Sequence, residues 1–496
     1  MKKKIFAASL FAIAILVGAA LTLSTFLQNL RPQIEGDFMS PIEKPATDFV
    51  DANFAWNVYR PVWEKFGFGE TDDGRFEEIF VNVEEPDGQV VDTRSVNPND
   101  DWLWTQAVEK LRRSEELLEG LRHGGSKVYW RVPYAWNENV AEKSLRDKIV
   151  LTKHLFWWHP QNALRQEVYG QLGNSVLGYT DPQLQKLVLA ARLLIVDTRW
   201  AVEQGDVSRI VENVRTIFCF SNQASRSYSA AGNWIYLRIK TLGNDLLKEI
   251  ICRHRELLTL SDVEDLLEMH RTNFPMQYVD LDWFRKGLLD LLQRMYSGEG
   301  VGTGVLTAQG FNILKCDYEN SFHEYPVKST WVFHAPNFVN SLLLTTFPGR
   351  KQVWRAIEKI LGEIESTFNE PWQKNIQGKI IGDLESLREW NRIVGKEIDA
   401  LLELRRFYWH MALQDRAIAY SLCVIRFQKK FGSFPASADV LREELQYVDD
   451  SEQPLDRRIS FYYMTDFEDF MVSVYDPEAP SDGAHQITTS SNFSVK

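Results

Sequence analysis

The feature that most constrains this chain is an uncharged apolar run at its N-terminus. Lys2 to Lys4 are followed by residues 5–30, which carry no charge, and the next charged side chain is Arg31. Such a run can cross a bilayer as one helix, which takes roughly 20 apolar residues. The lysines favour an N-terminus left in the cytoplasm. We therefore predict a cytoplasmic tail over 1–4, an inner-membrane anchor over 5–27, and a C-terminal domain in the periplasm.

A cleaved signal peptide is the alternative interpretation of this segment. Lys2 to Lys4 would then be its basic start, and Ile5 to Val17 its apolar centre. Gly18 and Ala20 are small enough for signal peptidase. The apolar character continues through Leu27, which favours the anchor, and either interpretation exports the rest of the chain.

Composition describes the exported part as an ordinary folded protein. Hydrophobic residues make up 44% and charged residues 25% of the 496 residues, as in average globular domains. The net charge is −12, and no basic block follows the N-terminus, so we expect no nucleic-acid partner. The disulfide state stays open, with free thiols favoured, because the cysteines are scattered without a CxxC pair: Cys219, Cys252, Cys316 and Cys423.

The region before residue 101 shows little helical periodicity. Prolines make 28–53 a linker, and 54–100 has a mixed α/β pattern. Within it, Phe76 to Val83 and Gln89 to Thr93 are strand-like and flank the turn signal of residues 85–88.

Residues 101–400 are predicted to be a helical domain. An apolar stripe from Leu184 to Val202 stops at Gly205-Asp206, and a second stripe runs from Val207 to Phe218, which predicts an αα-hairpin. Two further helix signals are a capping-box pattern at Ser261 and Glu264 and a stripe from Val353 to Phe368.

The C-terminal region, 401–485, combines a long helix with a small β element. We predict a helix from Glu397 to Lys430, ended by Gly432 and Pro435. Ile459–Met464 and Phe470–Tyr475 then predict a β-hairpin, and 486–496 a disordered tail. The predicted fold class is mainly α.

A weak pattern in residues 416–482 carries a resemblance. The matching pieces are Ala417-Ile418-Ala419, Phe431 to Pro435, Ser437 to Leu445, and Val472 to Tyr475. They resemble a C-terminal module of uncharacterised membrane-anchored bacterial proteins, which is similar to the head of the major pseudopilin of type II secretion. The hairpin around Gly205-Asp206 resembles the preceding helical region of that group. Departures at Gln453–Asp456 and Tyr475–Pro477 mean that the resemblance implies neither a calcium site nor polymerisation.

Few residues suggest chemistry, because the common hydrolase and phosphate-binding motifs are absent from the sequence. The catalytic candidates are His323, Glu324 and Asp415. Asp415 lies on an apolar stripe and needs a buried partner, for which we expect an arginine in a structural ion pair. His270 lies on the apolar face of its helix and is expected to be a satisfied core residue. No metal site or cofactor is predicted.

Aromatic side chains crowd residues 102–158 and suggest either a Trp-rich core or a binding surface. The binding candidates are Trp130, Trp136, Trp157 and Trp158; Trp102 and Trp104 belong to the same stretch.

Two functions are compatible with these patterns. The favoured hypothesis is a non-catalytic interaction or scaffolding protein, held in the cytoplasmic membrane by Ile5 to Leu27 and bound to an envelope protein. The alternative is an envelope hydrolase or glycan-binding protein that uses the aromatic region.

Overall fold

The computed structural model describes part of the chain at the level of elements and side chains. The described residues are 12–24, 30, 55–65, 82–84, 90–92, 101–127, 184–226, 230–270, 281–298, 304–307, 310–311, 313–314, 344, 347–367, 382–385, 387–388, 391–437, 439–440, 460–465, 469–475 and 485–488.

The described elements confirm a mainly helical fold with small antiparallel sheets. The helices after residue 55 are α3 (Trp56–Lys65), α5 (Asp101–Arg113), α6 (Glu115–Gly125), α9 (Leu184–Gln204), α10 (Val207–Ser225), α11 (Ala230–Arg253), α12 (Leu260–Glu268), α13 (Leu281–Met295), α17 (Arg350–Thr367) and α19 (Arg392–Phe431). The strands are β1 (Asn82–Glu84), β2 (Val90–Asp92), β3 (Ser460–Thr465), β4 (Phe470–Tyr475) and β5 (His485–Thr488).

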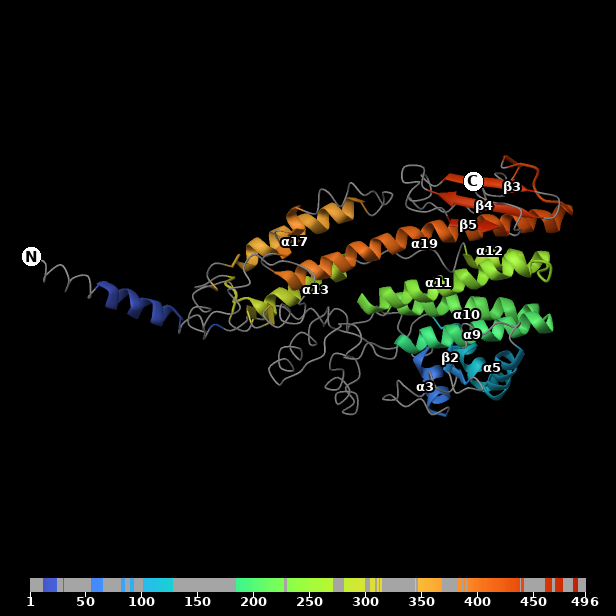
Figure 1. The fold of residues 1–496 in the computed structure, drawn as a ribbon, viewed down its shortest axis with the longest axis horizontal. Coiled ribbons are helices and arrows are strands. Elements are labelled where there is room, and N and C mark those ends of the chain that lie inside the picture. Colours follow the sequence, from blue (N-terminus) through green and yellow to red (C-terminus); the bar gives the residue numbers. More distant parts are fainter. Residues whose placement is uncertain are drawn as a thin grey trace, which may run out of the picture.

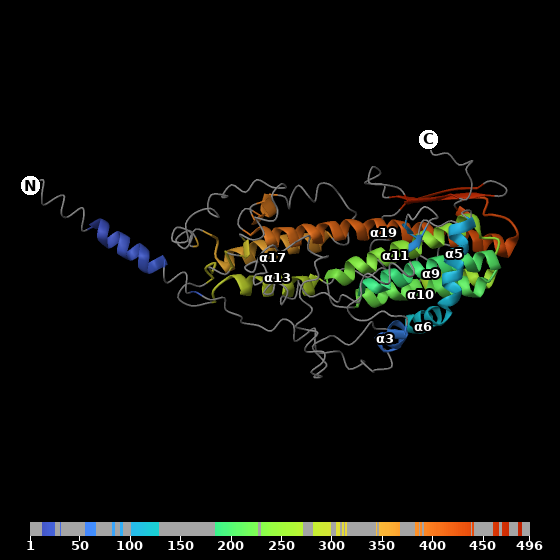
Figure 2. The ribbon, with the colours of Figure 1, turned by 60° about the horizontal axis from the view of Figure 1, so that its bottom comes forward.

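The elements form an elongated body built along α19 (Figure 1). Helices α13 and α17 lie beside the N-terminal half of α19, whereas α11 and α12 pack on its C-terminal half and α9 and α10 lie beyond α11. Figure 2 shows the sheet β3–β4–β5 on one side of α19, and α3 and α6 beyond α10 on the other. The body is therefore layered as sheet, long helix, helical hairpins and outer helices.

A separate helix covers residues 12–24, within the predicted anchor, and lies apart from the body (Figure 1). Within the described parts of the chain, no helix has both the length and the apolarity to cross a membrane. The remaining anchor residues, 5–11 and 25–27, lie outside the described residues.

The predicted αα-hairpin is confirmed as α9 and α10. Gly205 has φ 66°, a left-handed conformation that glycine adopts without steric cost. Asp206 then caps α10, because its carboxylate accepts a hydrogen bond from the backbone N–H of Arg209 at 3.1 Å. Helix α11 packs against both members of the hairpin, which makes a three-helix layer.

The capping box of α12 lies two residues earlier than the sequence pattern predicted. Thr259 accepts from the backbone N–H of Asp262, and the Asp262 carboxylate accepts from the backbone N–H of Thr259 at 2.8 Å. The prediction of Ser261 and Glu264 was wrong because both pairs have capping-box spacing, and only the pair at the helix start has unpaired backbone N–H groups.

Helix α19 begins at Arg392, before the predicted Glu397 and across the expected boundary at residue 400. Asn391 caps it by accepting a hydrogen bond from the backbone N–H of Val394 at 3.3 Å. Every side chain from Asp415 to Ile425 is buried, because α11 and α12 cover one side while β4 and β5 cover the other. A helix that is apolar on all sides is expected in such a position.

The C-terminal β-hairpin is confirmed, and a third strand extends it. Strand β3 pairs with β4 in register from Ser460↔Tyr475 to Thr465↔Phe470. Strand β5, His485–Thr488, pairs with the other edge of β4 and includes residues that the sequence predicted to lie in a disordered tail. The sequence of β5 contains one large apolar residue, Ile487, so its signal was too weak to predict a strand; backbone pairing with β4 forms it.

The sheet is fixed to the end of α19 at a short turn. The Tyr463 hydroxyl donates to the backbone carbonyl of Pro435 at 2.9 Å, and the rings of Phe434 and Phe470 have centroids 5.5 Å apart. The turn begins at Gly432, which has φ 75°. The residues predicted to end the long helix therefore also attach the sheet.

Replacing Gly432 by alanine should destabilise the fold by about 1–2 kcal/mol, because an L side chain is strained at positive φ. Gly362, in the interior of α17 with open space around it, is the matched control: alanine there should stabilise by about 0.5–1 kcal/mol. Denaturant unfolding measures both. Equal effects of the two substitutions would contradict a left-handed Gly432.

Candidate functional site

Of the residues predicted to carry function, the structure places Asp415. His323, Glu324, Trp130, Trp136, Trp157 and Trp158 lie outside the described residues. From the same aromatic stretch, Trp104 is described: it is buried, and its indole N–H donates to Glu203 of α9 at 2.7 Å. Trp104 therefore packs α5 onto α9.

Asp415 lies at the interface of α19 with α11 and holds two polar groups of α11. The Lys240 ammonium Nζ is 2.7 Å from Oδ2 of Asp415, and the Asn244 amide Nδ2 donates to Oδ1 at 2.7 Å. The exposed fractions are 1% for Lys240, 0% for Asn244 and 8% for Asp415. The expectation of an arginine partner was wrong. Lys240 lies one helical turn before Asn244. Its compact ammonium occupies one oxygen of Asp415 and leaves the other to the Asn244 amide, whereas an arginine fork would bind both.

Aromatic rings close one side of this cluster. The Lys240 Nζ lies 6.0 Å from the centroid of the Tyr236 ring, and Tyr236 stacks on Tyr408 of α19 with centroids 5.8 Å apart. Burial, with a smaller contribution from Tyr236, raises the pKa of Tyr408 well above its usual value. The phenol therefore stays protonated, and uncharged aromatic rings lie on this side of the charged pair.

His270, just beyond α12, approaches the same carboxylate. Its Nε2 is 4.0 Å from Oδ1 of Asp415 and has no hydrogen-bond partner among the described residues. Burial lowers the pKa of His270 to about 4, although the Asp415 carboxylate opposes this shift; Lys240 and Arg416 reinforce it. His270 is thus neutral at pH 7. It is a core residue as expected, but its Nε2 is not satisfied.

The geometry of this cluster limits its chemistry. A carboxylate lies between an ammonium, an amide and a neutral imidazole, all enclosed by α11, α12 and α19. Such groups can exchange protons with one another. The cluster therefore joins α11 to α19 and to the end of α12.

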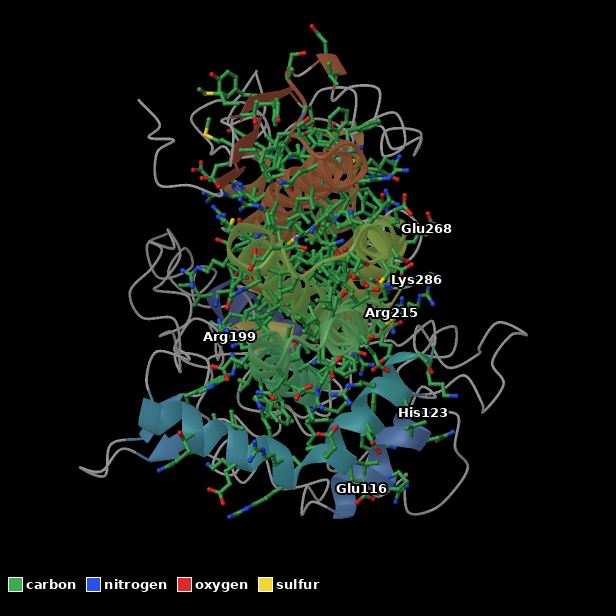
Figure 3. All side chains as sticks on the ribbon, turned by 90° about the vertical axis from the view of Figure 1, so that its right-hand side faces the viewer. Glu116, His123, Arg199, Arg215, Glu268 and Lys286 are labelled. Carbon is green, nitrogen blue, oxygen red and sulfur yellow. The ribbon has the colours of Figure 1, made fainter. Side chains whose placement is uncertain are left out.

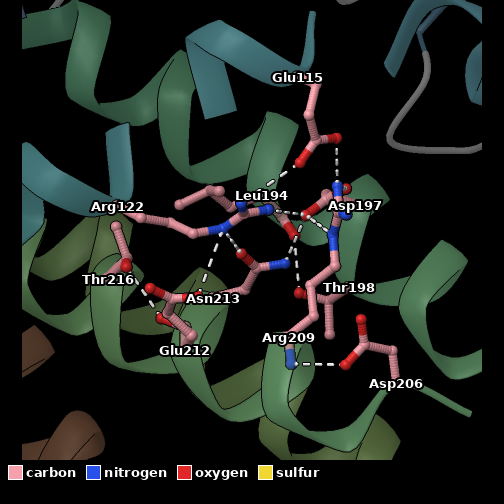
Figure 4. Close-up of polar contacts among 10 residues, drawn as sticks. All are labelled: Glu115, Arg122, Leu194, Asp197, Thr198, Asp206, Arg209, Glu212, Asn213 and Thr216. Atoms are coloured by element: carbon pink, nitrogen blue, oxygen red, sulfur yellow. Dashed lines mark hydrogen bonds and ion pairs between the residues drawn. The ribbon is translucent and has the colours of Figure 1, made fainter. Parts of the chain in front are cut away.

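A second buried carboxylate, Asp197 of α9, was not singled out from the sequence. It is fully buried and accepts from Arg122 of α6 at 2.7 Å and from Arg209 of α10 at 2.6 and 2.9 Å (Figure 4). Asn213 of α10 adds a hydrogen bond at 2.7 Å. A carboxylate on the apolar stripe, the signal that identified Asp415, is also present here: Asp197 follows Leu194 by three residues.

Acidic and aromatic side chains complete this network. Glu115 lies 2.8 Å from Arg209 and 3.6 Å from Arg122, and the Arg209 guanidinium lies 5.0 Å from the centroid of Trp200. Burial alone would lower the pKa of Arg209, but hydrogen bonds to Asp197 and Glu115 raise it. The network thus joins α6 to the α9–α10 hairpin through charges that are paired inside the protein.

Acidic and basic side chains also lie on the outside of the helical body. Figure 3 shows Glu268, Lys286 and Arg215 along one side of the helices, with His123 and Glu116 on α6. In the described part of the chain, no group of three or more His, Cys, Asp or Glu side chains is arranged to hold a metal ion.

Comparisons with protein-family models, with curated proteins and with solved structures returned no match for this chain. The assignment of function therefore depends on the physical features of the chain itself.

Asp197→Asn should destabilise the protein by about 3–5 kcal/mol, because it leaves two largely buried arginines without their shared carboxylate. Glu109→Gln is the matched control: Glu109 pairs with Arg113 on the surface of α5, where such pairs contribute less than about 1 kcal/mol. Denaturant unfolding distinguishes them. A loss below about 1 kcal/mol for Asp197→Asn would contradict a structural role.

The lowered pKa of His270 predicts a pH dependence of stability. The unfolded state takes up a proton on this imidazole near pH 6.5, and the folded state only near pH 4. The contribution of the neutral His270 to the free energy of unfolding is therefore fully present above pH 6.5 and is lost as pH falls toward 4. His270→Gln should flatten this decline in unfolding free energy, whereas His123→Gln, on the exposed side of α6, should not. An unchanged decline in His270→Gln would refute the shift.

Proposed function

We propose that this protein is a membrane-tethered interaction protein of the cell envelope, with its helical body on the outer side of the cytoplasmic membrane. The observation that carries this proposal is the apolar surface of helix 12–24. Its large apolar side chains are 44–68% exposed: Ile13, Ile15, Leu16, Val17, Leu21 and Leu23. Contiguous exposed apolar surface of this kind is uncommon on soluble monomers and marks contact with a membrane or a partner.

The flanking sequence supports a membrane as the covering phase. Helix 12–24 lies inside the uncharged run 5–30, and Lys2 to Lys4 precede that run. A membrane-spanning helix with this charge pattern inserts with its N-terminus in the cytoplasm. The body, separated from helix 12–24 by the linker, would then face the periplasm.

An interaction role is favoured over catalysis by the state of the buried charges. Asp197 and Asp415 are both engaged with basic side chains of neighbouring helices, and Asp415 is enclosed. Both carboxylates are therefore bound to groups inside the helical body, which favours an interaction role over catalysis on an external substrate. From the sequence pieces described above, we also propose that residues 416–482 are a module of the pseudopilin-head kind.

The topology is tested with a phosphatase reporter fused after Lys496 and by extraction of membranes with alkaline carbonate. We expect an active reporter and a chain that stays in the membrane pellet. Leu16→Asp combined with Leu21→Asp should release the chain, because each charge costs about 2.5–3.5 kcal/mol at the centre of a spanning helix. Phe407→Asp, which changes a 50% exposed side chain of the body, should not.

Two outcomes would contradict the proposal. An inactive reporter would place the body in the cytoplasm, and a soluble periplasmic product shortened near Ala20 would show a cleaved signal peptide instead of an anchor.

A further inference from the structure

Three polar side chains meet in the apolar interface between α11 and α19. The two oxygens of Asp415 each hold one nitrogen at 2.7 Å: Nζ of Lys240 on Oδ2 and Nδ2 of Asn244 on Oδ1. All three residues are more than nine-tenths buried. Asn244 Nδ2 also lies 3.2 Å from Sδ of Met411 and 3.5 Å from Oε1 of Gln414.

The orientation of the Asn244 amide follows from this contact. An ionised carboxylate only accepts hydrogen bonds, so the amide must turn its nitrogen toward Asp415. Its carbonyl oxygen Oδ1 then has no hydrogen-bond partner among the described residues, although the residue is fully buried. A buried acceptor without a partner costs about 1–3 kcal/mol, so this amide is held in an unfavourable state.

Lys240 and Asn244 are also neighbours on one helix. They are four positions apart on α11, where Cβ atoms lie about 5–6 Å from each other, a distance that a lysine side chain spans. The same carboxylate therefore contacts the amine through one oxygen and the amide nitrogen through the other. Fixing a nucleophile beside its target in this way replaces a bimolecular encounter and accounts for much of the acceleration of such reactions.

We propose that Lys240 and Asn244 join in an intramolecular amide bond, with Asp415 as the catalytic carboxylate. Oδ2 of Asp415 takes a proton from the Lys240 ammonium, and the neutral amine attacks Cγ of Asn244. The new bond joins Nζ to Cγ. The bond from Cγ to Nδ2 breaks, and Nδ2 leaves as ammonia after it receives the second proton of the lysine nitrogen through the carboxylate. Asp415 ends the reaction as a neutral carboxylic acid, so atoms and charge balance without an oxidant or cofactor.

The apolar surroundings favour both the start and the end of this reaction. A buried ammonium and a buried carboxylate are costly to desolvate, and the reaction replaces this charged pair by a neutral amide and a neutral acid. The product contains no charge on the lysine nitrogen, and the released ammonia leaves the site. The cross-link would staple one turn of α11 where it meets α19.

Trypsin digestion of the full-length, denatured protein followed by mass spectrometry tests the proposal. An unmodified chain gives one peptide ending at Lys240 and another spanning Thr241 to Lys248. A cross-linked chain resists cleavage after Lys240 and gives one peptide from Ile239 to Lys248, lighter by one ammonia. Lys240→Arg should abolish that loss of ammonia, whereas Lys248→Arg, at an exposed position of the same helix, should retain it.

The role of Asp415 is tested in the same digest with Asp415→Asn, which should leave Lys240 cleavable and the ammonia retained. Normal cleavage at full mass in the unaltered protein would overturn the proposal. So would a peptide from Thr241 to Lys248 lighter by one ammonia, since a cyclic imide at Asn244 leaves Lys240 free. A loss of water that joins the Lys240 and Asp415 peptides would show a different bond and would likewise overturn it. These results on the unaltered chain decide the question even if the variants do not fold.

Discussion

Helix α19 lies between the helical layer and the C-terminal sheet, and both layers pack on it. From Asp415 to Ile425 every side chain is buried, because α11 and α12 pack on one side and β4 and β5 on the other. A small antiparallel sheet is marginal in water without a partner to pack on. The long helix supplies that partner, and it also packs on α11 of the helical layer, where Tyr408 stacks on Tyr236.

Buried charges determine how these layers fit together. Desolvating an ion costs several kcal/mol unless its partner is well placed. Two of the buried carboxylates meet this requirement with residues distant in sequence: Lys240 for Asp415, and Arg122 for Asp197. A shift of α19 along α11 by one turn would separate Asp415 from Lys240 and Asn244. The charged contacts therefore favour the observed register of α19 on α11.

The sequence predicted those parts of the fold that depend on local patterns. Periodicity and turn chemistry are local, so they predicted three features of the fold. These are the helices on both sides of Gly205-Asp206, the end of α19 at Gly432, and the strands β3 and β4. Strand β5 and the partner of Asp415 could not, because both depend on which distant segments meet. Asp197 carried the same signal as Asp415, a carboxylate on an apolar helix face, and could have been found.

We infer that α19 joins the helical layer and the C-terminal sheet into one cooperative unit. Native-state hydrogen exchange tests this most directly, by comparing the opening free energies of buried amides in α10, in α19 and in β4. We predict that Ile217, Leu422 and Val472 exchange through the same global opening, with one free energy and one dependence on denaturant. Exchange of Val472 through an opening several kcal/mol lower than that of Ile217 would show that the sheet unfolds alone and would contradict the account.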